Sequence, residues 1–144
     1  MIDLGPAIRI ALVEDVEISG LLSEWNNEAA VFTRRPVPTD AEYPFIVIST
    51  DIAVTDNDTL NTMHQQVLRD IAVYGEQPSH FRVVEQIGYL IRTLFHRRKL
   101  SLGSVDGHAV IEIIATGPIS APTSDETIVG RVVTIAISLQ EVPS

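Results

Sequence analysis

The alternation of side chains near the end of the chain is the sequence feature that most constrains its fold. One set of alternate positions is apolar and the intervening set is polar or small: Val133, Ile135, Ile137 and Leu139 against Thr134, Ala136, Ser138 and Gln140. A period of two is typical of a strand, because successive side chains of a strand point to opposite faces of a sheet. Residues 127–141 are therefore predicted to form a strand with one buried face.

Four further segments are predicted to be strands: 30–34, 45–54, 65–75 and 108–116. The densest run of β-branched residues lies in 45–54, which favours a central position in the sheet. The polar segment 55–64 that follows is too long for a tight turn, so we expect a hairpin tip there.

The first predicted helix covers residues 3–15. Asp3 can cap its start, because a carboxylate can accept a hydrogen bond from a free N–H of the first turn. Glu14 and Asp15 are unfavourable near the negative end of a helix dipole, so the helix is expected to stop there. A further short helical turn is expected around Ile18.

The second predicted helix covers residues 79–99, with Ser79 as its cap. Its apolar positions recur with helical spacing: Phe81, Val84, Ile87, Ile91, Leu94 and Phe95. Arg97, Arg98 and Lys99 follow at its end, where positive charge is favoured by the helix dipole. These basic residues could also touch phosphate, but we favour the capped helix end.

The order of these elements is helix, three strands, helix, two strands. Runs of strands interrupted by a helix favour an α+β fold. We expect a mainly antiparallel sheet of about five strands with two main helices packed on one face. A length of 144 residues supports one hydrophobic core, so residues 1–144 are expected to be a single domain.

The charge balance makes some partners improbable. The formal net charge is −9, which argues against an exposed basic face that clamps nucleic acid. The chain has no cysteine, which excludes disulfides and thiolate chemistry. We expect neither a signal peptide nor a membrane-spanning helix, because the start lacks a basic leader pattern and the chain has no run of about 18 apolar residues.

A search for catalytic or metal-binding patterns finds no constellation. The four histidines, His64, His80, His96 and His108, have no chelating spacing and are expected to be solvated or packed. Asp56-Asn57-Asp58 resembles the start of a calcium loop, but Leu60 lies where the third ligand belongs. We therefore predict no enzyme activity, no cofactor and no metal site.

Three segments together resemble a known family. They are Met-Ile-Asp-Leu-Gly-Pro-Ala-Ile-Arg at residues 1–9, Val-Phe-Thr-Arg-Arg-Pro-Val-Pro at 31–38, and Tyr-Pro-Phe-Ile-Val-Ile-Ser at 43–49. Their order and spacing are similar to those of the tail terminator, or tail completion, family of siphophages and gene transfer agents. The resemblance extends over essentially the whole chain.

The resemblance implies a structural protein of the virion. Members form a ring, usually six-fold, that stacks on the last ring of the tail tube, stops tube growth and faces the neck of the head. The expected partners are further copies of the chain, the tail tube protein and a neck or head completion protein, with assembly in the host cytoplasm. DNA would pass through the lumen without specific binding, and no catalytic residue is implied.

Other classes of function remain open. A neighbouring neck protein, which joins head to tail, is the nearest alternative. A small-molecule-binding α+β domain would show a deep pocket ringed by polar groups, and a nucleic-acid-binding module would show salt-dependent retention on heparin.

Two groups of residues are candidates for contacts. Asp56, Asn57 and Asp58 form an acidic tip that we expect near the ring lumen or the tube-facing surface, with a solvated loop as the alternative. The basic candidates for contacts with other subunits or with the neck are Arg34, Arg35, Arg97, Arg98 and Lys99.

Overall fold

The computed structural model describes residues 4–33, 37–49, 53–56, 64–98, 102, 104–105, 107–121, 123 and 125–141. The helices are α1 (Gly5–Glu14), α2 (Val16–Leu21) and α3 (Phe81–Phe95). The strands are β1 (Glu24–Trp25), β2 (Glu28–Ala29), β3 (Val31–Phe32), β4 (Phe45–Ile48), β5 (Ala53–Asp56), β6 (His64–Glu76), β7 (Ser104–Val105), β8 (His108–Ser120) and β9 (Ile128–Glu141).

Seven of the described strands form one sheet, in the order β3-β4-β6-β9-β8-β7, with β5 also paired to β6. Neighbouring strands are antiparallel except β3 and β4, which are parallel. Strands β6 and β9 pair along the whole of β6, from His64 opposite Gln140 to Glu76 opposite Ile128. The predicted α+β class and mainly antiparallel sheet are confirmed.

The strand predicted over 45–54 is wrong as a single element. Strand β4 ends at Ile48 and β5 begins at Ala53, and both pair with β6. The physical reason lies at Ser49, whose side-chain Oγ accepts the N–H of Asp70 at 2.9 Å. The side chain thus takes a donor that a regular ladder would give to a backbone carbonyl.

Strand β8 continues to Ser120, beyond the end predicted at residue 116. Its register with β9 shifts between Thr116 and Ile119, which marks a bulge. Gly117 lies in this bulge with a φ of 106°, and a Cβ there would stand 2.8 Å from the carbonyl oxygen of Val132. Glycine is required at such a position, so the Gly-Pro pair bends the strand instead of ending it.

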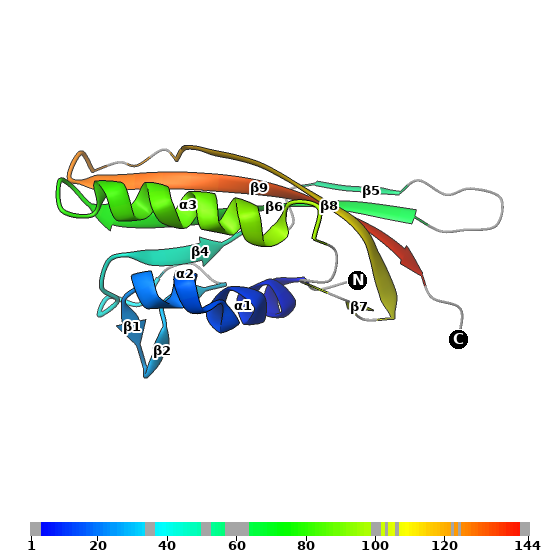
Figure 1. The fold of residues 1–144 in the computed structure, drawn as a ribbon, viewed down its shortest axis with the longest axis horizontal. Helices are drawn as coiled ribbons and strands as arrows, with labels where there is room; N and C mark the ends of the chain where they lie inside the picture. The colour runs from blue at the N-terminus through cyan, green and yellow to red at the C-terminus, as the bar shows by residue number, and fades with distance from the viewer. Residues whose placement is uncertain are drawn as a thin grey trace.

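The core lies between the sheet and the helices, which cover the same face (Figure 1). The alternate apolar positions predicted for the last strand, Val133, Ile135, Ile137 and Leu139, are all buried. They pack in one cluster with side chains of α1 and of α3, including Ile8, Leu12, Val84, Ile87, Ile91 and Phe95. The predicted placement of helices on one face is confirmed.

The first helix ends where the sequence predicts. Helix α1 stops at Glu14, and Asp15 then caps α2 through a 3.0 Å hydrogen bond from the N–H of Ile18 to its carboxylate. The start of α1 has Leu4 at the N-cap without a side-chain bond, while the predicted cap Asp3 lies outside the described residues.

The prediction of a helix over 79–99 is too long at both ends. Helix α3 begins at Phe81, and its N-cap is His80 and not Ser79, whose hydroxyl instead donates to the Glu76 carbonyl at 3.5 Å. The helix ends at Phe95 because Arg97 has a φ of 58°. A left-handed residue of this kind ends an α-helix.

Aromatic residues form a second, smaller cluster on the other face, beside β3 and β4. Trp25 lies edge-on to Phe32 with ring centroids 5.5 Å apart, and Phe32 lies edge-on to Phe45 at 5.8 Å. The Phe45 ring stacks on Tyr43 at 4.8 Å. Phe32 and Phe45 are thus buried in this cluster, and Trp25 is partly buried against it.

Candidate interaction surfaces

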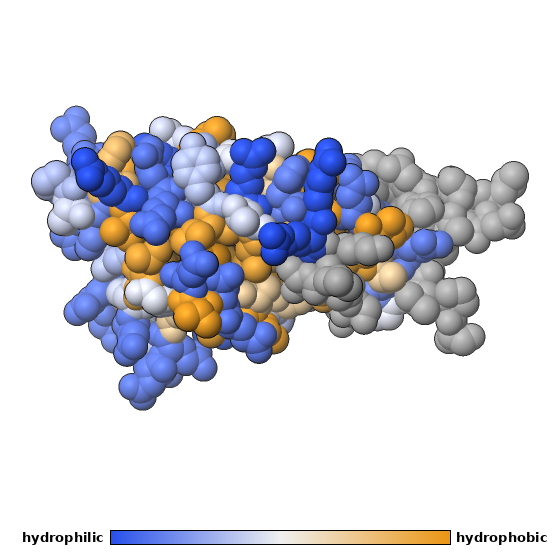
Figure 2. Space-filling model, viewed as in Figure 1, coloured by the Kyte–Doolittle hydropathy of each residue, from blue (hydrophilic) through white to orange (hydrophobic). Residues whose placement is uncertain are grey.

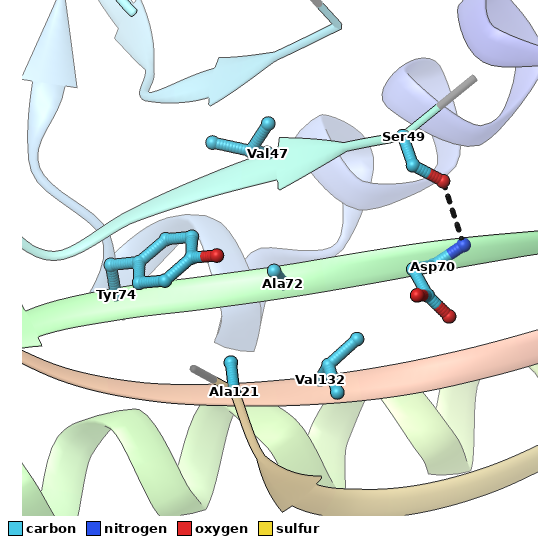
Figure 3. Close-up of a pocket in the computed structure, with 7 residues that line it drawn as sticks. All are labelled: Val47, Ser49, Asp70, Ala72, Tyr74, Ala121 and Val132. Atoms are coloured by element: carbon cyan, nitrogen blue, oxygen red, sulfur yellow. Dashed lines mark hydrogen bonds between the residues drawn. The ribbon is translucent and has the colours of Figure 1, made fainter. Parts of the chain in front are cut away.

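The face of the sheet turned away from the helices carries a polar row that crosses β6, β9 and β8 and ends at Ser49, directly after β4. Asp70 of β6 stands opposite Thr134 of β9, which stands opposite Thr116 of β8. The Thr134 hydroxyl donates to a carboxylate oxygen of Asp70 at 2.5 Å. The Ser49 hydroxyl oxygen accepts the N–H of Asp70 (Figure 3). The row is held by internal hydrogen bonds, so its geometry is fixed in the free chain.

A hollow of about 160 Å³ lies at one end of this row, beside Ser49 and Asp70. Figure 3 shows its lining: Val47, Ser49, Asp70, Ala72, Tyr74, Ala121 and Val132. The lining offers one carboxylate, which already accepts a hydrogen bond from Thr134. Within the part of the chain that the structure describes, no three histidine or acidic side chains gather where they could hold a metal ion.

The sheet face turned away from the helices carries different charged side chains from the face that the helices cover. Pairing register places Asp70, Glu112, Ser138 and Gln140 on the open face. The arginines of the central strands point elsewhere: Arg69 is buried, and Arg131 reaches Glu85 of α3 at 3.3 Å. Over the described side chains of β6, β8 and β9, this open face therefore carries acidic and neutral groups without an arginine.

The end of α3 is joined to strand β8. The backbone N–H of Arg97 donates to the carbonyl of Ile113 at 2.7 Å, and that of Arg98 donates to the Phe95 carbonyl at 3.1 Å. Both arginine side chains are exposed. These candidates therefore close the helix end through their backbone groups. The other basic candidates, Arg34, Arg35 and Lys99, lie outside the described residues.

The candidate acidic tip is described in part. Asp56 is the last residue of β5 and pairs in register with Gln65 of β6. Asn57 and Asp58 lie outside the described residues, as does most of the segment predicted as a tip.

Two of the four histidines have structural partners. The Nδ1 atom of His80 accepts the N–H of Glu76 at 3.1 Å, and that of His96 accepts the N–H of Ala115 at 3.1 Å. Each imidazole therefore fixes a turn or a junction beside α3, in agreement with the prediction of packed histidines.

Two titratable groups near the β8–β9 turn have shifted pKa values. Burial raises the pKa of the Tyr43 phenol, and the negative charges of Glu76 and Asp125 raise it further. Hydrogen bonds from the Thr127 hydroxyl and N–H lower the pKa of the Asp125 carboxyl. The pKa values of the Tyr43 phenol and of the Asp125 carboxyl are therefore moved further apart than their ordinary values.

Apolar side chains are exposed on the helix side of the molecule. Figure 2 shows an apolar seam between α3 and the α1–α2 segment. Ile10 and Val16 are exposed on the α1–α2 side, and Phe81 and Tyr89 on α3. No described helix has the length and hydropathy needed to cross a membrane. An exposed apolar surface rimmed by polar groups is typical of a protein–protein contact.

Comparison with solved structures finds the same fold in a virus-like particle. The chain superposes with a TM-score of 0.76 on a chain from the virion of a native gene transfer agent particle, and the two sequences are 11% identical. The match covers 95% of this chain and 94% of the other. The sequence matches no protein-family model and no curated protein. At this identity, the superposition establishes a shared fold.

Proposed function

We propose that the chain is a structural virion protein, namely a tail terminator whose copies form a ring on the end of the tail tube. The observation that carries this proposal is the superposition over nearly the full length of both chains with a component of a gene transfer agent virion. The three sequence segments that resemble the tail terminator family support the narrower assignment.

The geometry of the chain supports an assembly role over a catalytic one. The hollow on the open face already has its carboxylate hydrogen-bonded. An active site needs convergent polar groups that are free to act on a substrate. The exposed apolar residues on both helix segments are instead suited to contacts with other proteins.

The proposed partners are further copies of the chain, the tail tube protein and a neck or head completion protein. A ring, six-fold by the family resemblance, would stop polymerisation of the tail tube protein and present its other surface to the neck or head completion protein. The protein would reside at the head–tail junction of the virion after assembly in the host cytoplasm. Double-stranded DNA would pass through the lumen without specific binding, with the tip around Asp56 near the lumen or the tube.

Tube capping tests the proposal. Purified protein is added to the tail tube protein of the same particle while tubes polymerise, and tube length is measured by negative-stain imaging. Growth should stop, with one ring at the end of each tube. Tubes that continue to grow at the same rate, with bare ends, would contradict a terminator. Binding to the head-side neck without any effect on tubes would identify a neck protein instead.

A further inference from the structure

We infer that neighbouring copies in the ring meet head to tail, the arginine-bearing face of α3 on one copy contacting the acidic α1–α2 and hairpin surface of the next. The inference rests on the proposed function, since it specifies how the ring closes. The partner is a second copy of this chain.

The basic surface lies on α3 and the turn after it. We call it the arginine face; its members are the exposed residues Arg82, Tyr89, Arg92 and Arg97. The acidic residue of this segment is Glu85, which is engaged by Arg131 at 3.3 Å. Because Glu85 is drawn to the sheet side, it leaves the positive charge of the outer surface of α3 largely in place. Figure 2 shows strongly hydrophilic side chains over this helix.

The acidic surface lies on the N-terminal elements. We call it the acidic face; its members are the exposed residues Glu14, Val16, Glu17, Glu24 and Glu42. The described cation of this region is Arg9, and it is already bound to Glu28 at 2.6 Å and to the Val31 carbonyl. Among the residues that the structure describes, Arg9 therefore does not neutralise the glutamates of the acidic face.

The two faces belong to helices that pack on different strands of the sheet, and α2, which carries Val16 and Glu17, also packs against α3. Helix α1 packs on β3 and β4, at one end of the strand order, whereas α3 packs on β6, β9 and β8, toward the other end. Figure 1 shows α3 above α1 and α2, with the β1–β2 hairpin below them. Two different patches that meet between copies form a heterologous contact, which closes into a ring when the rotation between copies allows it.

The chemistry of the two faces fits an interface between copies. Each face combines exposed apolar atoms, Tyr89 on one and Val16 at 83% exposure on the other, with charges of one sign. Tyrosine and arginine are enriched at protein interfaces. A chain of net charge −9 repels its copies unless its positive charges meet negative ones. Screening beyond about 8 Å makes this pairing effective only in direct contact.

Charge reversal of each face tests the inference. One variant carries Arg82→Glu with Arg92→Glu, and the other carries Glu14→Arg with Glu17→Arg. Native mass spectrometry with tail tubes present should show that each variant alone loses the ring, while circular dichroism shows it folded. An equimolar mixture should regain rings with the two variants in equal numbers, because each reversed face then meets its complement. Glu112→Arg with Glu126→Arg, which changes charge elsewhere, should leave the ring intact.

The outcomes separate this inference from the proposed function. If the wild-type chain forms rings and both reversed variants do too, or if the mixture fails to restore them, the pairing of these faces is wrong and the terminator role stands. If the wild-type chain forms no ring on tubes, the proposed function itself fails. Should a reversed variant unfold, Arg82→Gln with Arg92→Gln replaces it. That variant should require a higher protein concentration for half-assembly than wild type, and an unchanged concentration would overturn the inference.

Discussion

The Nδ1 atom of His96 accepts a 3.1 Å hydrogen bond from the backbone N–H of Ala115, and this bond joins the end of helix α3 to the outer side of strand β8. The N–H of the next residue, Arg97, donates to the carbonyl of Ile113 at 2.7 Å. Strand β8 pairs with β7 over only two residues, so much of its outer edge lacks a strand partner among the described residues. The helix end thus satisfies two edge groups that would otherwise be open to pairing with another chain.

Loss of the His96 imidazole should destabilise the fold. His96→Ala leaves the N–H of Ala115, in a part-buried position, without its acceptor, which costs about 1 kcal/mol or more of unfolding free energy. His96→Asn is the matched control, since its amide oxygen can accept the same bond and should recover part of the loss. Urea unfolding measures both values, and equal stability of His96→Ala and wild type would contradict this role.

Close contact between α3 and the β8 bulge makes Gly88 sensitive to substitution. A Cβ at Gly88 would lie 2.8 Å from the Cβ of Pro118, so Gly88→Ala should cost about 1–3 kcal/mol by overpacking. Gly20 in α2 has nothing within 4 Å of an added Cβ. Gly20→Ala should therefore be neutral or stabilising by up to about 1 kcal/mol through helix propensity. Thermal melts compare the two variants, and equal effects would refute the packing argument.

The polar row on the open face should depend on Thr134 more than on Thr116. Thr134→Val removes the hydroxyl that donates to Asp70 at 2.5 Å, at a cost of about 1–2 kcal/mol because the part-buried carboxylate loses a partner. Thr116 donates to the Thr134 carbonyl at 3.4 Å in an exposed position, so Thr116→Val should cost less. Denaturant midpoints should rank the variants in this order; the reverse order would exclude the row as a stabilising feature.

The Asp125 carboxyl should titrate below the ordinary aspartate range. Its pKa is lowered by the Thr127 hydroxyl, which donates at 2.7 Å, and by the Thr127 N–H at 2.9 Å. A lowered folded pKa contributes stability above the unfolded pKa, and this stability is lost as pH falls through the folded value. NMR titration of the carboxyl measures the pKa. Thr127→Val should move it back toward the ordinary value, and no movement would disprove the cause.

Sequence patterns predicted the parts of the fold that depend on periodicity. The alternation around Ile135 located a long strand with one buried face, and the helical spacing from Val84 to Phe95 located the buried side of α3. Both patterns are local, since burial of one face of a regular element imposes the period directly. The end of α1 at Glu14 was predicted for a similarly local reason.

The errors arose where a tertiary contact or a single backbone conformation decides. The break after Ile48 depends on a hydrogen bond between Ser49 and Asp70, residues far apart in sequence. The continuation of β8 depends on the positive φ of Gly117. In the sequence alone, the Gly-Pro pair indicates an ordinary loop. Helices α3 and α1 pack on different strands, and this separates their charged residues. Their placement follows from the strand order, which no sequence periodicity predicts.

The central claim is that copies of this chain form a closed ring on tail tubes. Native mass spectrometry of the purified chain with tubes of its own particle, at micromolar concentration, tests this claim most directly. The account predicts a closed oligomer of one defined size, six copies by the family resemblance, released from tube ends. A strict monomer in the presence of tubes would contradict it.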